Sequence, residues 1–284
     1  MLTLLPNPAR RRHPIQRTPT QRLLDRDFYR NGPNHRGDRE VGFGDVKRRF
    51  GLRTVTIGRW VTKAEQASTA NHFYDALADL QTILHGTADL LSLRGTLSLT
   101  YGRGGQPGVA AHYEPASRTL ALAKNAGPGS IAHEWFHALD HYLADKAFKT
   151  ATAGRFASSA WLADSPAIGH PLNQLLFDCY QAILLNEAGT GTSELFKRSV
   201  EADRSQGGLY YSLPEELAAR SFEAFVQDAP LKNHFLVKGT LESPEAKQGL
   251  YPQAAQRARI NEAFNRYFQA LGNALARQGS PAGQ

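Results

Sequence analysis

Apolar residues between Thr62 and Leu84 recur every three to four positions, which is the repeat of one face of an α-helix. Thr62 and Glu65 have the spacing of a capping box, in which each side chain bonds the backbone N–H of the other residue. Gly86 follows as a helix stop. The pattern therefore predicts a helix from Thr62 to about Leu84.

Three shorter apolar runs predict a small sheet after this helix. They cover residues 91–101, 109–113 and 119–123. The last two runs are joined by a turn at residues 114–117, which is typical of an antiparallel hairpin. We therefore expect a small antiparallel sheet.

Helical spacing and end signals predict four further helices. One follows a break of glycine and proline, with Ser130 as its candidate N-cap, and the others cover about residues 170–186, 213–228 and 254–276. Strands are confined to one part of the chain. The sequence therefore predicts an α+β fold in which helices predominate.

The two ends of the chain lack this periodicity. Residues 1–40 are rich in Arg, Pro, Asn and Gly, and residues 279–284 read GSPAGQ. Such segments bury too little apolar surface to order a chain. We predict a basic, largely disordered segment over 1–40, a single domain over 41–278 and a loose tail over 279–284.

The positive charge belongs to the front of the chain. Residues 1–60 contain 14 Lys and Arg against 5 Asp and Glu, although the net charge of the whole chain is only +7. This asymmetry favours a polyanion partner, such as a nucleic acid bound through the basic first 60 residues. A solvated basic tail without a partner is the alternative.

Cys179 is the only cysteine, so no disulfide can form within the chain. No apolar run approaches the roughly 20 residues that a membrane-spanning helix needs. The stretch before Pro6 is too short for the apolar core of a signal peptide. These features favour a cytoplasmic protein outside the membrane. They also leave His and carboxylate side chains as the candidate metal ligands.

His133, Glu134 and His137 form an HExxH motif. Residues four apart on a helix lie one turn apart on the same face, so both imidazoles can bind one ion, for which Zn²⁺ is the typical choice. Glu134 lies about 100° around the helix from His133, where it can take a proton from a water molecule beside the ion. The alternative is a helix whose surface histidines coincide by chance.

Two more residues of the same helix are candidates for supporting roles. Asp140 can orient an imidazole through its free N–H, although simple solvation would also explain it. His141 lies about 12 Å from His133 along the helix axis, so three histidines cannot converge on one ion. We expect His141 to lie outside the ligand set.

A catalytic zinc usually takes a third protein ligand. Ser212 and Glu215 form a capping box, and Glu216, Arg220 and Glu223 share the polar face of the helix that follows. Glu216 and Glu223 are about 10.5 Å apart along the axis, so only one can bind the ion directly. We predict Glu216 as the ligand and Glu223 as the alternative. With Glu216 bound, Arg220 and Glu223 would form a supporting pair. A solvated charged face is the other interpretation.

Candidates for holding and activating a substrate are less specific. The strand at residues 119–123 precedes the metal helix, and its free N–H and C=O groups could hold a peptide as an added strand. His112, Tyr210 and Tyr211 are candidates for stabilising a developing oxyanion. Their spacing does not choose among them, and aromatic packing in the core would explain each as well.

Residues 111–143, AHYEPASRTLALAKNAGPGSIAHEWFHALDHYL, resemble the core of the first type of large polyvalent protein-associated domain. That domain occurs in multidomain proteins of phages and conjugative elements and is regarded as zincin-like. The chain as a whole resembles the bacterial CLCA_X family over about residues 27–270. Besides residues 111–143, that second resemblance rests on FYRNGPNHRGD, IGRWVT, LRGTLSLTYGRGG, PEELAARSFEAFVQD and LYPQAAQRARINEAFNRYF.

These resemblances imply a zincin-like fold and a metallopeptidase of the gluzincin type. They imply His133 and His137 as ligands, Glu134 as base, and a downstream glutamate pattern that Glu216 and Glu223 match. Phe136 is a departure, because the polyvalent domain often has glycine there. A bulky side chain beside His137 could narrow the cleft.

Two functions of different classes fit these observations. The first is a zinc-dependent metallopeptidase that hydrolyses peptide bonds in a protein or peptide substrate. The second is a nucleic-acid-associated protein, or an interaction protein related to mobile elements, whose metal site is structural or vestigial. A protease that acts on DNA-bound proteins would combine the two.

Overall fold

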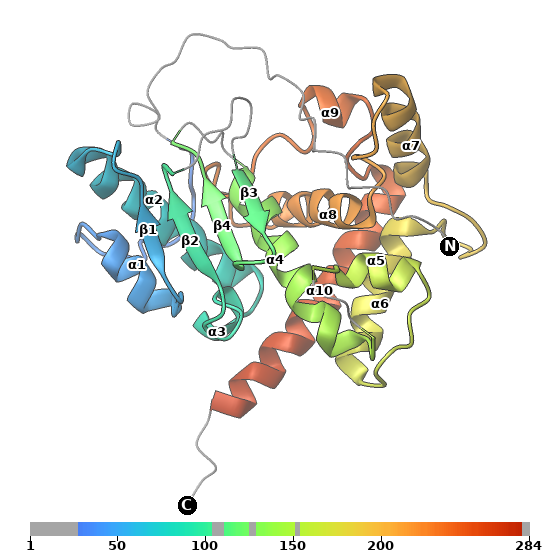
Figure 1. Ribbon diagram of the computed structural model, residues 1–284, viewed down its shortest axis with the longest axis horizontal. Helices are drawn as coiled ribbons and strands as arrows, with labels where there is room; N and C mark the ends of the chain where they lie inside the picture. Colours follow the sequence, from blue (N-terminus) through green and yellow to red (C-terminus); the bar gives the residue numbers. More distant parts are fainter. Residues whose placement is uncertain (1–27, 104–110, 125–128, 151–153, 280–284) are drawn as a thin grey trace, which may run out of the picture.

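The computed structural model describes residues 28–103, 111–124, 129–150 and 154–279. A small sheet lies on one side of the molecule and most of the helices on the other, with α4 (Ser130–Ala147) between them (Figure 1). Helix α4 packs against strands of the sheet and also against the helices α5 (Ala157–Leu162) and α8 (Pro214–Asp228). It therefore belongs to both layers.

The sheet is mixed, with three parallel strands and one antiparallel strand. Its strands are β1 (Val55–Ile57), β2 (Ser98–Tyr101), β3 (Ala111–Glu114) and β4 (Thr119–Leu122), in the order β1-β2-β4-β3. Strands β1, β2 and β4 are parallel, and only β3 runs antiparallel to β4. The predicted hairpin is confirmed, but the prediction of a purely antiparallel sheet is wrong.

The strand predicted over residues 91–101 is also too long. The short helix α3 (Ala88–Leu91) ends at the first residue of that range, residues 92–96 form a turn, and only Ser98–Tyr101 pairs in the sheet. The second hairpin strand, β4, is paired on both sides, so it has no free edge to offer a peptide. The free edge beside α4 belongs to β3, which corrects the expectation placed on residues 119–123. Residues 109 and 110 of the first hairpin run lie outside the described residues.

The predicted helix after Thr62 is confirmed as α2 (Lys63–Ile83). The hydroxyl of Thr62 accepts a hydrogen bond from the Glu65 N–H at 3.3 Å, and the Glu65 carboxylate accepts one from the Thr62 N–H at 2.8 Å. These reciprocal bonds satisfy two donors that a helix start leaves unpaired. Helix α1 (Phe43–Phe50) precedes it and was not predicted.

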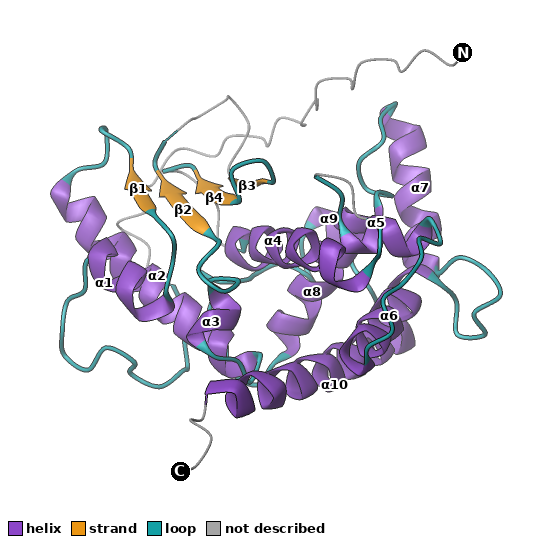
Figure 2. Ribbon diagram, turned by 60° about the horizontal axis from the view of Figure 1, so that its bottom comes forward, coloured by secondary structure: helices purple, strands orange, loops and turns teal. Residues whose placement is uncertain are grey.

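The helices predicted for the second half of the chain are confirmed as α6, α8 and α10. Three further elements were not predicted: α5, which precedes α6, and α7 and α9, which lie between the predicted helices. The bounds of those not yet given are α6 (Pro171–Leu184), α7 (Glu194–Gln206), α9 (Pro244–Lys247) and α10 (Ala254–Gly279). Figure 2 shows α10 as a long helix along the base of the molecule, where it packs on α6 and α8. Among the described helices, none is both long and apolar enough to cross a membrane.

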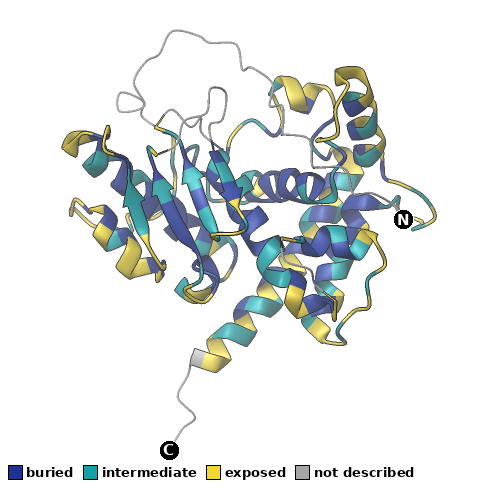
Figure 3. Cartoon of the chain, viewed as in Figure 1, coloured by how far each residue is buried: buried dark blue, intermediate teal, exposed yellow. Residues whose placement is uncertain are grey.

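Aromatic side chains join α4, α8 and α10 in the core. Phe222 of α8 stacks on Phe136 of α4 with ring centres 4.8 Å apart, and it lies 5.6 Å from the ring of Trp135. On its other side the rings of Phe264 and Phe268 of α10 lie 5.8 Å and 5.7 Å away. Figure 3 shows α4 and α8 as largely buried. Phe136 therefore points into this core, and the concern that it narrows a cleft at the site does not arise.

Residues 28–40, which were assigned to a disordered segment, are part of the ordered fold. Arg30 and His35 both bond the carboxylate of Asp79 on α2, at 2.6 Å and 2.8 Å. Asn233 donates to the same buried carboxylate at 2.8 Å. Arg36 pairs with Asp75 one turn earlier, at 3.0 Å. Ordered structure thus begins before Val41, and residues 1–27 and 280–284 lie outside the described residues.

We predict that Phe222→Ala will lower the free energy of unfolding by about 3–5 kcal/mol, because it opens a cavity where α4, α8 and α10 meet. Urea denaturation of the two proteins measures the difference. Leu241→Ala is the control, since Leu241 is 59% exposed and its truncation is expected to change stability by less than about 0.5 kcal/mol. Equal losses in both variants would contradict the core described here.

Candidate metal centre

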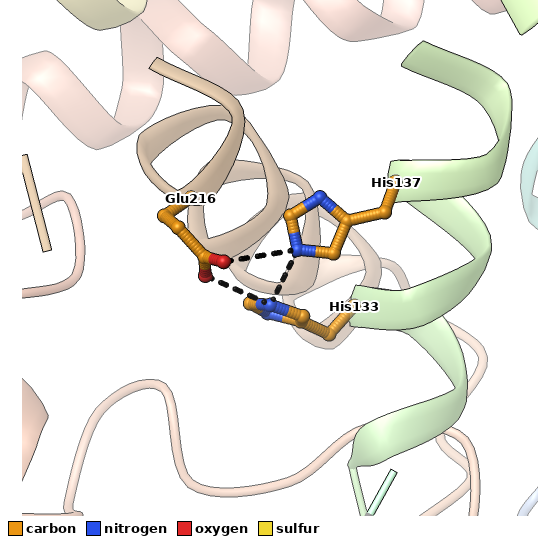
Figure 4. Close-up of side chains that lie close together, drawn as sticks. All are labelled: His133, His137 and Glu216. Carbon is orange, nitrogen blue, oxygen red and sulfur yellow. Dashed lines mark hydrogen bonds and ion pairs between the residues drawn. The ribbon is translucent and has the colours of Figure 1, made fainter. Parts of the chain in front are cut away.

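Three side chains from two helices converge on one point in the structure. His133 and His137 come from successive turns of α4, and Glu216 comes from the first turn of α8 (Figure 4). The two Nε2 atoms are 3.0 Å apart. The Glu216 carboxylate places Oε2 3.3 Å from the His133 Nε2 and Oε1 3.5 Å from the His137 Nε2.

These three distances fit the edges of a coordination tetrahedron. Zinc bonds to imidazole nitrogen and carboxylate oxygen are about 2.0–2.2 Å long, so adjacent ligands on a tetrahedron lie about 3.4 Å apart. The triangle of residues formed by His133, His137 and Glu216 has sides of 3.0, 3.3 and 3.5 Å, and the two sides at Glu216 end on different carboxylate oxygens. Within the described residues, these three form the group whose ligand atoms all lie within 4.8 Å of one another. The arrangement leaves a fourth position for a small molecule.

The start of α4 depends on a glycine. Gly129 is the N-cap, with φ of 100°, and a Cβ on it would lie 3.1 Å from the backbone nitrogen of Lys238. Neither the conformation nor the space suits a larger residue. Ser130 was predicted as the cap, but it is the first residue of the helix. Gly129 therefore fixes where α4 begins, one turn before His133.

The start of α8 also differs from the prediction. Leu213 is its N-cap and makes no side-chain cap bond, so the capping box of Ser212 and Glu215 is wrong. The Ser212 hydroxyl donates instead to Asp203 at 2.6 Å, and the Glu215 carboxylate accepts from the Ser159 hydroxyl at 2.7 Å. Glu216 still falls in the first turn of α8, where its carboxylate faces α4 (Figure 4).

Glu223 bonds the second ring nitrogen of His133, whose first ring nitrogen faces Glu216. Its Oε1 lies 2.7 Å from the Nδ1 of His133, and the hydroxyl of Tyr251 donates to the same carboxylate at 3.2 Å. An ionised carboxylate only accepts, so the His133 Nδ1 carries a proton; when the ring is neutral, its Nε2 keeps the lone pair that can bind an ion. A carboxylate behind a ligand imidazole is the usual support of a zinc site.

The charges of the site balance around a divalent cation. Burial lowers the pKa of His133, but hydrogen bonds to Glu216 and Glu223 outweigh it and raise that pKa well above its usual value. Burial raises the pKa of Glu216, but His137 and His133 outweigh it and hold the carboxyl ionised. Two buried carboxylates carry a charge of −2, and unpaired buried charge is costly. A divalent ion neutralises both.

The Oε2 atom of Glu216 gives a further indication. It is buried, and it has no partner with good hydrogen-bond geometry among the described residues. When the His133 ring is neutral with its proton on Nδ1, the Nε2 lone pair faces this oxygen across 3.3 Å. Two facing lone pairs at this distance are stable when a cation lies between them. The donor set of two imidazoles and one carboxylate is one that zinc favours.

Tyr210 is the oxyanion candidate that the structure brings to the site. Burial is the largest cause that raises the pKa of its hydroxyl well above the usual value, and the charges of Glu216 and Glu134 add to it. Tyr210 as a whole is 41% exposed. Because its hydroxyl is buried, the exposed surface belongs to the rest of the residue. Glu134 itself is half-buried. The hydroxyl of Tyr210 is therefore close enough to the Glu216 carboxylate for that charge to act on it.

A carboxylate that the sequence analysis missed holds the turn that carries Tyr210. Asp203 of α7 accepts from the backbone N–H groups of Tyr210, Tyr211 and Ser212 at 3.0, 2.8 and 2.8 Å. It is 6% exposed. One buried side chain thus sets the conformation of three successive residues at the entrance to α8.

The predicted pair of Arg220 and Glu223 does not form. Arg220 donates to the carbonyl of Leu250 at 2.8 Å, to the Ser199 hydroxyl at 3.3 Å and to the carbonyl of Tyr211. Its guanidinium also lies over the Tyr211 ring, 5.3 Å from the centre. Arg220 and Tyr211 therefore join α7, α8 and the loop before α10. Tyr251 takes the supporting place that was expected of Arg220.

Asp140 does not orient an imidazole either. Its carboxylate accepts from the Ser158 N–H at 2.9 Å, the Ser158 hydroxyl at 2.5 Å and the Tyr180 hydroxyl at 2.7 Å. Burial raises the pKa of Asp140 to about 6 despite these donors. The residue ties α4 to α5 and α6. No described residue bonds the Nδ1 of His137.

His141 and His112, the other two histidines considered in the sequence analysis, lie apart from His133 and His137. His141 is bonded through Nδ1 to the Tyr113 hydroxyl at 2.8 Å, which links α4 to β3. This agrees with the expectation that it lies outside the ligand set. His112 sits on β3 opposite Ala121. Among the described residues, no hydrogen bond or ion pair joins His112 to the ligand group.

The family model of large polyvalent protein-associated domain 1 matches residues 202–275. The matched region begins beside Asp203, contains Glu216 and Glu223, and covers most of α10. It does not reach α4, although the resemblance was drawn on residues 111–143. No curated protein and no solved structure matches the chain. The resemblance to the CLCA_X family stays a prediction.

We predict that Glu216→Gln will lose most of the bound zinc, because it removes the charged ligand. Glu223→Gln is expected to keep zinc but to bind it about 10- to 100-fold more weakly, as changes behind a ligand imidazole usually do. Elemental analysis and a chelator competition measure the two effects. Full zinc in Glu216→Gln together with loss in Glu223→Gln would reverse the assignment.

We predict that Asp140→Ala will lower the free energy of unfolding by about 2–4 kcal/mol, because three donors lose a buried charged acceptor. Its zinc content should match that of the unchanged protein when both are folded. Denaturation measures stability and elemental analysis measures zinc. Asp145→Ala on the exposed side of α4 is the control and should be nearly neutral. Specific loss of zinc in Asp140→Ala would restore the role first expected of it.

Proposed function

We propose that the protein is a zinc-dependent metallopeptidase with a zincin-like site. The observation that carries the proposal is the triangle of His133, His137 and Glu216, whose edges suit tetrahedral zinc. The triangle leaves a coordination position open, which is typical of catalytic rather than structural zinc sites. Glu134 adjoins His133 in the motif, and the charge of Glu216 acts on the hydroxyl of Tyr210. These are side chains that can move a proton and stabilise a negative charge.

The chain's own residues supply the proton transfers. Zinc, when bound, acts as a Lewis acid toward a peptide carbonyl and lowers the pKa of water. Glu134, which follows the ligand His133 in the motif, would accept a proton from the attacking water and deliver it to the leaving amine. The raised pKa of Tyr210 keeps its hydroxyl protonated, so it can donate a hydrogen bond to the developing oxyanion.

The sheet offers a way to hold an extended peptide. Strand β3 is the edge of the sheet and packs against α4. An edge strand presents unpaired N–H and C=O groups, which can pair with a segment of another chain. We propose β3 from His112 to Glu114, in place of the strand first expected, as the part of the described sheet that aligns a protein or peptide substrate with the metal centre.

Zinc is favoured over other ions by the type of ligand. Two imidazoles and one carboxylate suit zinc, whereas magnesium and calcium prefer oxygen ligands alone. The support of His133 by Glu223 and Tyr251 is what a metal-binding imidazole requires. A structural or vestigial metal in a nucleic-acid-associated protein is the alternative, and the experiment below separates the two functions.

We predict that Glu134→Gln will bind zinc as the unchanged protein does but will cleave peptides at least about 100-fold more slowly, since a general base contributes this much or more. A quenched-fluorescent peptide library measures cleavage, and elemental analysis measures zinc. Glu242→Gln, at an exposed site far along the chain, is the control. Equal cleavage by Glu134→Gln, or cleavage that survives removal of metal by a chelator, would overturn the proposal.

A further inference from the structure

A fully exposed tryptophan lies at one edge of the sheet. Trp60 follows β1 and is 87% exposed, more than any other large hydrophobic residue described. Strands β1, β2 and β4 are parallel, so their carboxyl ends meet at this edge. Ligands of sheets with parallel strands usually bind beyond the carboxyl ends. A single exposed tryptophan is ordinary on a protein surface, but Trp60 is distinguished by the cations around it.

Two glycines set the position of the loop that carries Trp60. A Cβ on Gly58 would lie 1.9 Å from the carbonyl oxygen of Gly102, and a Cβ on Gly102 would lie 2.3 Å from Val61. The loops after β1 and β2 can therefore touch only because both positions lack a side chain. Lys124, after β4, donates to the carbonyl of Trp60 at 3.3 Å. Three separate loops thus form one surface.

The side chains around Trp60 are positively charged. Arg59 precedes it in the loop after β1, Lys63 is the first residue of α2, Arg103 follows β2 and Lys124 follows β4, and all four are exposed. In the described parts of these loops and the first turn of α2 there is one carboxylate, that of Glu65, which lies 2.6 Å from the Lys124 ammonium. The remaining three cations have no carboxylate in these loops to neutralise them. We call Arg59, Trp60, Lys63 and Arg103 the carboxyl-edge patch.

We propose that the carboxyl-edge patch binds single-stranded nucleic acid. A flat aromatic ring surrounded by cations matches a chain of flat bases joined by phosphates: the indole stacks on a base, and Arg59, Lys63 and Arg103 contact the backbone. A base in a duplex is already stacked on both faces, so it cannot use the exposed face of Trp60 without unpairing. The patch therefore favours single strands over duplexes.

This binding site is independent of the metal centre. It contains no residue of the ligand group, and none of its residues lies on α4 or α8. It is also separate from the basic segment over residues 1–27, whose six arginines lie outside the described residues. Failure of peptide cleavage would leave the nucleic-acid proposal intact, and the reverse also holds.

The test uses the full chain and a fluorescein-labelled 12-nucleotide oligo-dT, with binding followed by anisotropy at several salt concentrations. Trp60→Ala should weaken binding about 5- to 150-fold, the loss of one base stack, and Trp60→Phe should recover part of it. Arg59→Glu with Arg103→Glu should weaken binding and reduce the slope of log K against log salt by about 1.4, since two phosphate contacts are lost.

The matched control is Lys47→Glu with Arg49→Glu. Both residues are exposed on α1, away from the carboxyl ends of the strands, and this pair changes the net charge by the same amount. It should bind oligo-dT nearly as the unchanged protein does. Circular dichroism and thermal unfolding of every variant show that the fold is kept.

Tryptophan fluorescence gives a second readout. Trp135 is fully buried and Trp161 is half-buried, so quenching by unlabelled oligo-dT should come from Trp60 and disappear in Trp60→Phe. An oligo-rU arm shows whether the site accepts RNA as well as DNA, and binding of either supports the proposal. Equal affinity of Trp60→Ala and the unchanged protein would overturn it. Equal loss in the control pair, or displacement of oligo-dT by poly-glutamate at equal charge, would overturn it too.

Discussion

The packing of α8 against α4 is the contact on which the proposed site depends. Glu216 and Glu223 are two turns apart on α8, and both face the same imidazole. One carboxylate lies on the Nε2 side of His133 and the other bonds its Nδ1. The ring therefore bridges two turns of the opposite helix. Phe222, one residue before Glu223, packs on Phe136 and Trp135 of α4. The core contact and the polar contact thus share one helix interface.

This interface brings together groups that resist burial. Glu216 is 3% exposed and Glu223 is 5% exposed, and a buried carboxylate is stable only when its charge is compensated. Two imidazoles compensate them when protonated, but two imidazolium rings whose nitrogens lie 3.0 Å apart would repel. A divalent cation removes the conflict, because it neutralises both carboxylates and leaves both rings neutral. The electrostatics and the spacing therefore favour the same occupant.

Long elements of the fold could be predicted from the sequence, and short or distant ones could not. Helices α2, α6, α8 and α10 repeat their apolar positions over several turns. Strand β1 has three half-buried residues, too few to show an alternation. The parallel pairing of β1, β2 and β4 joins segments some 20 to 40 residues apart, so no local turn signal encodes it. The wrong sheet type follows from seeing only the hairpin.

The same division holds for the site. His133, Glu134 and His137 are close in sequence, and their spacing alone indicates a shared ion. Tyr251 and Asp203 support the site through tertiary contacts that no spacing reveals. Arg220 was misassigned because charges three residues apart on a helix suggest a pair. Its long side chain instead reaches backbone carbonyls of two loops.

X-ray absorption at the zinc edge of the purified protein tests the central claim most directly, because it reports the ligands of the bound ion. The structure predicts a four-coordinate ion with imidazole scattering from two histidines and nitrogen and oxygen ligands at about 2.0–2.2 Å. An ion surrounded by six oxygens without imidazole scattering, or protein that takes up no zinc when folded, would contradict a site built from His133, His137 and Glu216.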